Sequence, residues 1–259
     1  LEQLILDHPL EVAYALALIT TRKNESILSE YVVKEFPKTQ SVLEAMRFTD
    51  CGSPVCSFCD IHMDPRRALS ERFHPHKDFR LFKGEAAPGV QEQAVRSALA
   101  GSSLLAVFPT GGGKSITYQL PALMRGALMR DLTVVISPLV SLMKDQVDVL
   151  RKRHKVVNAA YISSLLSPLE RDEALRQIRD GLVHLVYIAP ESLRSPTIFK
   201  LLVGRNIARF VIDEAHCLSS WGHDFRVDYL YIAEFLKTLA QAKGINGPIP
   251  VSCFTATAK

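Results

Sequence analysis

The chain has 259 residues, of which 47% are hydrophobic and 22% are charged, and its formal net charge at pH 7 is +4. This length allows one large core, or one domain with a small appendage. The composition is typical of a soluble globular protein, and the modest positive charge permits a polyanionic partner without requiring one. The longest apolar run, residues 12–20, is about half of the roughly 20 residues that span a bilayer, so we expect a buried helix there and no membrane association.

Residues 1–78 have the pattern of a helical accessory segment. The stretch "ESILSEYVVKEF" places apolar residues at three- and four-residue spacings, which predicts an amphipathic helix. The stretch "SVLEAMRF" continues this pattern, and no strand-rich segment precedes residue 80. The chain begins at Leu1 and has no basic region followed by an apolar core, so a secretory signal is not expected.

Three of the five cysteines lie in "CGSPVCSFCDIH", residues 51–62, with the spacing C-x4-C-x2-C-x2-H. The residues predicted to form a tetrahedral zinc site are Cys51, Cys56, Cys59 and His62. His74 or His76 could replace His62. The same thiols also match three ligands of a plant-type iron–sulfur cluster, which needs a fourth thiolate, and Cys217 and Cys253 lie inside other motifs. Thiols without a metal are the third alternative.

The odd number of cysteines has a consequence for the redox compartment. Five cysteines, three of them clustered, argue against a disulfide framework and favour a reducing cytosol.

After residue 90, short apolar runs rich in β-branched residues alternate with longer helical patterns. The runs are LLAVF (104–108), TVVIS (133–137), AAYI (159–162), LVYIA (185–189), FVID (210–213) and VSCF (251–254). Helical patterns such as "SLMKDQVDVLRKRHK" and "VDYLYIAEFLKTLAQAK" lie between them. Apolar strands that alternate with helices predict an α/β domain with a mainly parallel sheet, covered by helices on both faces.

The stretch "VFPTGGGKSITYQL" predicts a phosphate-binding loop between a strand and a helix. The residues expected to surround phosphate are Thr110, Gly111, Gly112, Gly113, Lys114 and Ser115. Glycines let the backbone turn tightly with its N–H groups pointing inward, and the helix N-terminus adds partial positive charge. Lys114 can reach the outer phosphates, and Ser115 can offer its hydroxyl to Mg²⁺. Phe108 stands where the general pattern has its first glycine, and a purely structural turn is the alternative.

The stretch "RFVIDEAH" ends an apolar strand in two acids and a histidine. At the carboxyl edge of a parallel sheet, Asp213 would face the phosphate loop. ATP hydrolysis needs one carboxylate to hold Mg²⁺ and another to orient water, and Asp213 and Glu214 suit these roles. His216 could contact a group that senses the γ-phosphate. Taken alone, the motif could also be a solvated strand end.

Five motifs in one order carry a family resemblance: "FPTGGGKSITYQLPAL", "ISPLVSLMKDQVDVL", "YIAPESL", "VIDEAHCLSSWGHDFRVDY" and "FTATA". Over about residues 79–259 the chain resembles the first RecA-like P-loop motor domain of RecQ-family DNA helicases, in superfamily 2. The most specific part is "DEAHCLSSWGHDFR". RNA helicases of the DEAH group resemble it less, because they usually carry GxGKT and SAT where this chain has GGGKS and TAT.

The resemblance implies roles for further residues. It assigns to an aromatic-rich loop, which couples single-stranded DNA contact to ATP hydrolysis, the residues Trp221, His223, Phe225 and Arg226. Thr255 and Thr257 match the motif that links nucleotide state to domain closure. Trp221 is the only tryptophan and lies in a polar loop, where stacking on a base is worth about 1–3 kcal/mol. Its alternative role is to plug the sheet edge.

Two further positions complete the expected site. Ser141 and Lys144 could contact the DNA backbone, although Lys144 could equally be a solvated helix charge. Gln91 falls where the family keeps a glutamine that reads the adenine edge. The family places Phe-Arg three residues before this glutamine, whereas here Arg80 lies much further from it, and Phe82-Lys83 is a competing alignment.

The sequence thus predicts a helical accessory segment over residues 1–78, with a metal knuckle over 51–62, and a RecA-like domain over residues 79–259. The implied function is ATP- and Mg²⁺-dependent DNA unwinding in the 3′ to 5′ direction, in DNA repair and recombination, on single-stranded and partly duplex DNA.

The chain ends before a second RecA-like domain, which normally supplies an arginine worth about 10³–10⁵ in rate, so we expect weak ATP binding and almost no hydrolysis from this chain alone. The alternatives are a non-catalytic ATP-binding or DNA-docking module, and an RNA helicase or other superfamily 2 translocase. The expected location is cytoplasmic, with the nucleoid if bacterial, or nuclear if eukaryotic.

Overall fold

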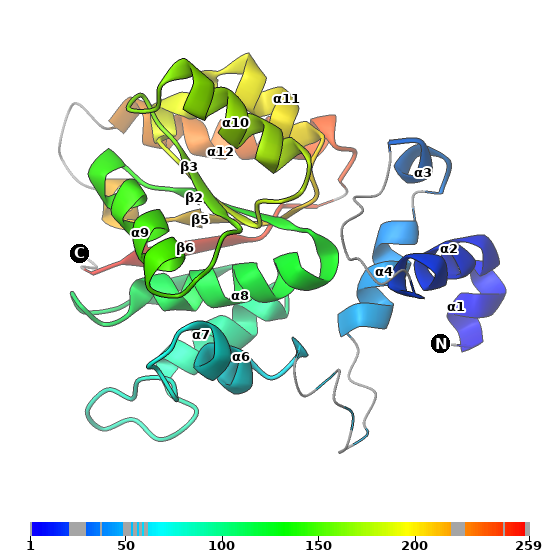
Figure 1. Cartoon of the computed structure of the whole chain (residues 1–259), viewed down its shortest axis with the longest axis horizontal. Helices are drawn as coiled ribbons and strands as arrows, with labels where there is room; N and C mark the ends of the chain where they lie inside the picture. The colour runs from blue at the N-terminus through cyan, green and yellow to red at the C-terminus, as the bar shows by residue number, and fades with distance from the viewer. Residues whose placement is uncertain are drawn as a thin grey trace.

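The structure is a computed structural model that combines a sheet domain with a group of small N-terminal helices (Figure 1). It describes residues 2–20, 30–36, 38–48, 53, 56, 59, 62–218, 226–245 and 247–256. No helix among these residues is long and apolar enough to cross a membrane.

The sheet has six strands in the order β1-β6-β5-β2-β4-β3, and every neighbouring pair is parallel. The strands are β1 (Leu104–Val107), β2 (Leu132–Ile136), β3 (Ala159–Ile162), β4 (Leu185–Ile188), β5 (Ile207–Ile212) and β6 (Val251–Thr255). All six predicted runs form strands, and the predicted parallel α/β domain is confirmed. The central strands β2 and β4 are buried along their whole length, as expected for strands covered on both faces.

Helices cover both faces of this sheet (Figure 1). One face packs against α10 (Pro168–Arg179), α11 (Pro196–Val203) and α12 (Arg226–Ala242). The other face packs against α7 (Val90–Leu99), α8 (Lys114–Met129) and α9 (Val140–Lys152), and α6 (Pro65–Arg72) packs on α7 and α8. Two 3₁₀ turns, η1 (Pro190–Arg194) and η2 (Ala215–Leu218), follow β4 and β5. The predicted helical stretches around α9 and α12 are confirmed.

Local sequence signals fix where some of these helices begin. Ser167 accepts from the backbone N–H of Glu170, and the Glu170 carboxylate accepts from the backbone N–H of Ser167, which forms a capping box at the start of α10. Asp64 caps α6 by accepting from the backbone N–H of Arg66, with Pro65 in the first turn.

The packing of Phe108 explains why it departs from the general phosphate-loop pattern. Its side chain is 1% exposed and lies between Phe82 and Phe254, with ring centroids 5.9 and 6.4 Å away. An aromatic side chain at this position therefore joins the end of β1 to the end of β6. Its burial holds the strands beneath the loop together.

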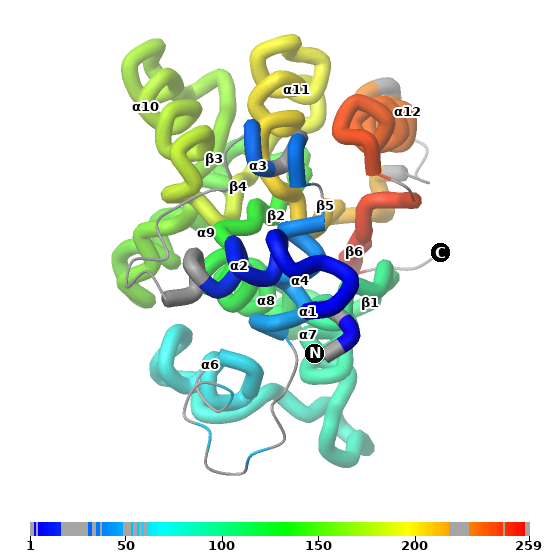
Figure 2. The backbone as a smooth tube through the Cα atoms, turned by 90° about the vertical axis from the view of Figure 1, so that its right-hand side faces the viewer, coloured from blue at the N-terminus to red at the C-terminus, as the bar shows by residue number. Residues whose placement is uncertain are grey.

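The N-terminal helices are α1 (Glu2–Asp7), α2 (Pro9–Thr20), α3 (Glu30–Glu35) and α4 (Thr39–Phe48). Val12 and Ala15 of α2 and Val42 of α4 pack against Leu128 and Met129 at the end of α8. Figures 1 and 2 place this group beside that end of the sheet domain.

The prediction that residues 12–20 form a buried helix is wrong in part. The helix forms, but only one face of α2 contacts α4 and α8. Leu10, Tyr14 and Leu16 of this helix are exposed to solvent.

The core of the sheet domain begins before residue 79. Ala68 and Leu69 of α6, with Phe73 just after it, belong to the buried cluster beneath α7, α8 and α9. The boundary between the accessory segment and the motor domain stays a prediction.

Candidate nucleotide-binding site

The predicted nucleotide residues meet at the carboxyl edge of the sheet. The phosphate loop follows β1, the DEAH motif follows β5, and Thr255 ends β6, which pairs with both of these strands. Because parallel strands end at the same edge, segments about 100 and 140 residues apart in sequence come together there. The sheet order therefore assembles the site, which no single stretch of sequence contains.

The loop backbone needs glycine at two positions. Gly111 and Gly113 have φ of +71° and +77°, in the left-handed region that residues other than glycine rarely adopt. A Cβ on Gly113 would also lie 2.5 Å from Nε2 of Gln91. The helix α8 starts at Lys114, so its N-terminal N–H groups and partial positive charge lie at the loop, as predicted. Thr110 is exposed beside these glycines, and Ser115 is half-buried in the first turn of α8.

Gln91 ties the loop to the segment before α7. Its Oε1 accepts from the backbone N–H of Arg80 at 2.7 Å, and its Nε2 donates to the carbonyl of Gly113 at 3.3 Å. The Arg80 guanidinium donates to the carbonyl of Gly111 at 2.7 Å. Arg80 and Gln91 therefore lie together despite their distance in sequence, because residues 81–89 loop out between them. The sequence did not predict that Arg80 contacts the loop, because Arg80 lies much further from Gln91 along the chain than the family pattern requires.

Lys114 and Glu214 form an ion pair across the edge. The Lys114 Nζ donates to Oε1 of Glu214 at 2.9 Å, and the two side chains are 16% and 23% exposed. Glu214 has φ of +50°, a left-handed conformation that is uncommon outside glycine and is found at functional sites. The predicted phosphate-binding cation and the predicted water-orienting carboxylate are thus in contact.

Asp213 is the buried carboxylate of the pair of acids. Its backbone N–H donates to the carbonyl of Ile136 at the end of β2, and its Oδ1 accepts from the backbone N–H of Glu214 at 3.0 Å. Burial raises the pKa of Asp213, and the neighbouring Glu214 charge adds to this effect while Lys114 opposes it. Asp213 forms no ion pair with any residue that the structure describes. Tyr229 of α12 donates to its backbone carbonyl at 3.4 Å, a contact that no sequence motif indicated.

His216 connects the DEAH motif to the end of β6. Its Nδ1 lies 3.2 Å from Oε2 of Glu214 and 3.2 Å from Oγ1 of Thr255. Thr255 is 4% exposed, so its hydroxyl is held in place by the surrounding core. The carboxylate of Glu214 is therefore held between Lys114 on one side and His216 on the other. These contacts join the phosphate loop, the DEAH motif and the TAT motif in one network.

The predicted DNA contacts are only partly within the described residues. Ser141 and Lys144 are both exposed on α9, whose first turn follows the carboxyl end of β2. Arg226 begins α12, but its side chain is not described. Outside the described residues lie Trp221, His223, Phe225 and Thr257. The aromatic-rich loop therefore stays a prediction.

The predicted zinc site gains no support from the structure. Cys51 lies outside the described residues, while Cys56, Cys59 and His62 lie within them. In the part of the chain that the structure describes, no three His, Cys, Asp or Glu side chains are grouped to hold a metal ion. Burial lowers the pKa of His62, and the positive charge of the nearby Arg72 lowers it further. A guanidinium close to His62 also opposes the binding of a second cation there.

Comparison with known proteins identifies the class. Residues 89–259 match the family model described as DEAD/DEAH box helicase, and the chain belongs to this family. Its curated relatives are RecQ- and RecS-type proteins. The chain is 46% identical over 173 residues to "ATP-dependent DNA helicase RecQ" of Bacillus subtilis, which covers 67% of this chain and 27% of that protein.

Two further relatives give the same result. The identity is 42% over 168 residues to "Probable ATP-dependent DNA helicase RecS" of Bacillus subtilis, covering 65% of this chain and 31% of that protein. The identity is 39% over 188 residues to "ATP-dependent helicase SGS1" of Saccharomyces cerevisiae, covering 70% of this chain and 12% of that protein. The chain thus spans less than a third of the length of each of these relatives. The predicted RecQ-type motor domain is confirmed.

Solved structures support the fold. A structure titled "Crystal Structure of DUF1998 helicase MrfA bound to DNA" matches with a TM-score of 0.55 at 22% identity, over 74% of this chain and 26% of that one. A structure of a hypothetical ATP-dependent RNA helicase from Sulfolobus tokodaii matches with a TM-score of 0.51 at 18% identity, over 74% of this chain and 50% of that one. These similarities concern the RecA-like helicase fold alone.

Proposed function

We propose that this chain is the ATP-hydrolysing half of a DNA helicase motor, which binds ATP and Mg²⁺ and unwinds DNA in the 3′ to 5′ direction when joined to a second RecA-like domain. The observation that carries the proposal is the contact between Lys114 and Glu214 at 2.9 Å. A protein that only binds nucleotide needs the lysine but has no use for a carboxylate held beside it. The RecQ- and RecS-type relatives, named as ATP-dependent DNA helicases, support the choice of DNA.

The residues suggest how phosphate binding prepares hydrolysis. The backbone N–H groups of the loop and the N-terminus of α8 bind phosphate oxygens, and Lys114 donates to the outermost phosphate. A phosphate oxygen that accepts from Lys114 replaces Glu214 as its partner. Glu214, still held by His216, then accepts a hydrogen bond from the attacking water and orients it. Thr255 fixes His216 in turn, so the position of Glu214 depends on β6.

The donor set at this edge suits Mg²⁺. The Asp213 carboxylate and the Ser115 hydroxyl are hard oxygen ligands, the type that Mg²⁺ prefers together with phosphate oxygens and water. Burial raises the pKa of Asp213, and this carboxylate forms no ion pair with the described residues, so a cation is the missing partner that favours its ionised form. When bound, Mg²⁺ neutralises charge on the transferring phosphate.

Other assignments complete the proposal. Gln91 reads the adenine edge, although its side chain also bonds to Arg80 and Gly113. Ser141 and Lys144 contact the DNA backbone. Single-stranded DNA stacks on Trp221 in a loop with His223, Phe225 and Arg226. Thr255 and Thr257 transmit the nucleotide state.

The test compares nucleic acids as stimulators of ATP hydrolysis. A longer protein that carries this chain with a second RecA-like domain is measured with single-stranded DNA, duplex DNA and RNA. We expect single-stranded DNA to stimulate most, and Glu214→Gln to lower the stimulated kcat by about 10²–10³ while ATP binding is kept. Stimulation by RNA alone would indicate an RNA translocase. Binding without any hydrolysis would indicate a docking module.

The isolated chain provides a second test. We expect it to bind ATP weakly and to hydrolyse almost none, because the transition-state arginine belongs to the second domain. Robust DNA-stimulated hydrolysis by this chain alone would contradict that part of the proposal.

A further inference from the structure

A small cavity lies at the amino edge of the sheet, opposite the nucleotide site. It has a volume of about 210 Å³ and is lined by the end of α6, the second half of α8, residues 154–156, Asn158 and His184. Asn158 and His184 directly precede β3 and β4, which places the cavity at the amino ends of these strands. Leu123, Ala127 and Val156 supply apolar walls. The volume is below the roughly 300–1,000 Å³ of pockets for drug-sized ligands, so a small ligand fits it best.

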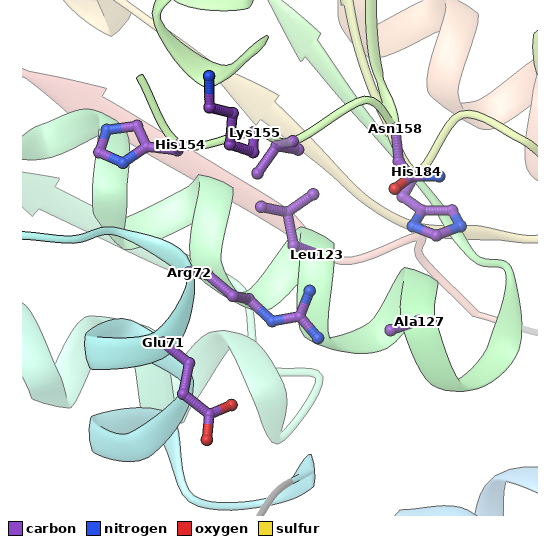
Figure 3. Close-up of a pocket in the computed structure, with 9 residues that line it drawn as sticks. Glu71, Arg72, Leu123, Ala127, His154, Lys155, Asn158 and His184 are labelled. Atoms are coloured by element: carbon purple, nitrogen blue, oxygen red, sulfur yellow. The ribbon is translucent and has the colours of Figure 1, made fainter. Parts of the chain in front are cut away.

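One side chain dominates this cavity. Figure 3 shows the guanidinium of Arg72 turned inward beside Ala127, in the direction of His184. Arg72 is half-buried and forms no hydrogen bond through its side chain and no ion pair with any residue that the structure describes. Burial lowers the pKa of Arg72. A half-buried guanidinium that forms no hydrogen bond to the described residues presents its N–H donors to the cavity, where an acceptor from outside can bind them.

The described lining holds one protein anion, and it is already paired with another arginine. The one carboxylate of the lining belongs to Glu71, which points away from Arg72 in Figure 3 and accepts from Arg67 at 3.0 Å. Lys155 adds a second cation at the rim, and it too has no ion pair among the described residues. The Nδ1 of His154 is buried without a hydrogen-bond partner in the described part of the chain.

The lowered pKa of the neighbouring His184 indicates the sign of the electrostatic potential at this edge. Burial lowers its pKa to about 4, and the positive charges of Arg130, Arg205 and Arg72 contribute to that shift. Several guanidinium groups thus act on one imidazole, and the potential at this edge is positive. Cations that line a small pocket attract a small anion with several acceptor oxygens.

We propose that this cavity binds a phosphate group through Arg72, with Lys155 at its rim, as a site separate from the phosphate loop. A tetrahedral phosphate can accept two parallel N–H bonds from the guanidinium, which suits arginine better than lysine. The phosphate is either inorganic phosphate or a phosphate of the DNA backbone, and the experiment separates these sources.

The first measurement is phosphate binding in a background where the loop is disabled. Inorganic phosphate is titrated by ³¹P NMR at constant ionic strength into Lys114→Ala, whose nucleotide site has lost its main cation. We expect saturable binding to remain. Adding Arg72→Gln should weaken it about tenfold or more, because a charge-assisted bidentate contact is lost.

The matched control is Arg67→Gln. Arg67 lies on the same helix and carries the same charge, but its guanidinium is paired with Glu71. It should leave phosphate binding within about twofold of the background, because only long-range charge is removed. Ala127→Leu fills the cavity without changing its charge, so it should also weaken phosphate binding. This variant tests the proposal if Arg72→Gln does not fold.

The second measurement identifies the source of the phosphate. A labelled single-stranded oligonucleotide is titrated into the chain with Arg72→Gln or Arg67→Gln alone, over a range of salt. A DNA source predicts weaker binding for Arg72→Gln only, with a salt slope reduced by about 0.7. A free-phosphate source predicts equal DNA binding by both variants. No phosphate binding in the Lys114→Ala background, or equal loss in both arginine variants, would overturn the proposal. Neither measurement uses ATP hydrolysis. A failure of the phosphate-site proposal can therefore be distinguished from a failure of the proposed function.

Discussion

The two edges of the sheet hold their charges in different ways. At the carboxyl edge, Lys114 and Glu214 neutralise each other at 2.9 Å, and Nδ1 of His216 lies 3.2 Å from the same carboxylate. At the amino edge, Arg72 faces a cavity in which the one carboxylate of the described lining, that of Glu71, is paired with Arg67. The pair at the carboxyl edge has both of its charges within the protein, and in the proposed function it exchanges partners when phosphate binds. The guanidinium at the amino edge has no such pair among the described residues, which is why we propose an anion from outside. We thus propose phosphate binding at both edges, and a water-orienting role for the carboxylate of Glu214 at the first.

The largest expected effect tests the carboxyl edge. Lys114→Ala should weaken ATP binding by the isolated chain about 100-fold, because a cation that bonds to phosphate is worth about 3 kcal/mol. A fluorescent ATP analogue titrated into both proteins measures this. The control is Lys152→Ala, which removes an exposed lysine paired with Asp148 at 2.9 Å on α9. Equal affinities for Lys114→Ala and the control would mean that the loop does not hold the phosphates.

The next effect tests how tightly the amino edge is packed. A Cβ on Gly126 of α8 would lie 2.2 Å from Cγ of His184, so Gly126→Ala should displace the imidazole. We expect the free energy of unfolding to fall by about 2 kcal/mol, as for other overpacked cores, measured by urea titration.

Its control is Gly204→Ala. Gly204 has φ of −76°, and its added Cβ would meet nothing nearer than 3.7 Å. This substitution should change the free energy of unfolding by less than about 0.5 kcal/mol. If both variants are equally stable, the close contact between α8 and His184 is absent.

The smallest effect is a pH dependence at the same edge. The pKa of His184 is lowered to about 4 in the folded chain from 6.5. The unfolded chain therefore binds more protons between these values, so stability falls as the pH decreases through that window. Between pH 7 and pH 5.5 the loss from this group should be about 1 kcal/mol.

The measurement is urea unfolding at both pH values for the wild type and two variants. His184→Gln should remove the share of the pH dependence that belongs to this imidazole. His74→Gln, which removes an exposed imidazole, is the control for the loss of a histidine. The same pH dependence in all three proteins would show that burial and the neighbouring cations do not lower the pKa of His184.

The sequence predicted the carboxyl edge better than the amino edge for a physical reason. The phosphate loop and the DEAH motif are short contiguous patterns at strand ends, and strand parallelism alone brings them to one edge. All six strands followed from apolar runs of four or five residues. The ion pair of Lys114 with Glu214 and the bridging position of His216 required the sheet order, which the sequence does not state.

Other features could not be predicted from sequence. Arg72, Leu123 and His184 come from three separate elements without a motif, so their cavity appears only in the fold. The exposed face of α2 was missed because an apolar run does not show which of its sides finds a partner. The cysteine spacing suggested zinc, but among the described residues Cys56, Cys59 and His62 do not form a metal-binding group, and Cys51 lies outside that part of the chain.

Residues 81–89 offer a position for a fluorescent label beside the candidate nucleotide-binding site. Their two ends are attached to the phosphate loop, through Arg80 to Gly111 and through Gln91 to Gly113. Ala86 lies near the middle of this loop and is exposed. The entropic cost of closing such a loop grows only slowly with its length. A fluorophore attached at Ala86 would therefore be coupled to the candidate nucleotide-binding site without lying in it. On the proposed function, we expect its fluorescence to change when ATP binds and when it dissociates.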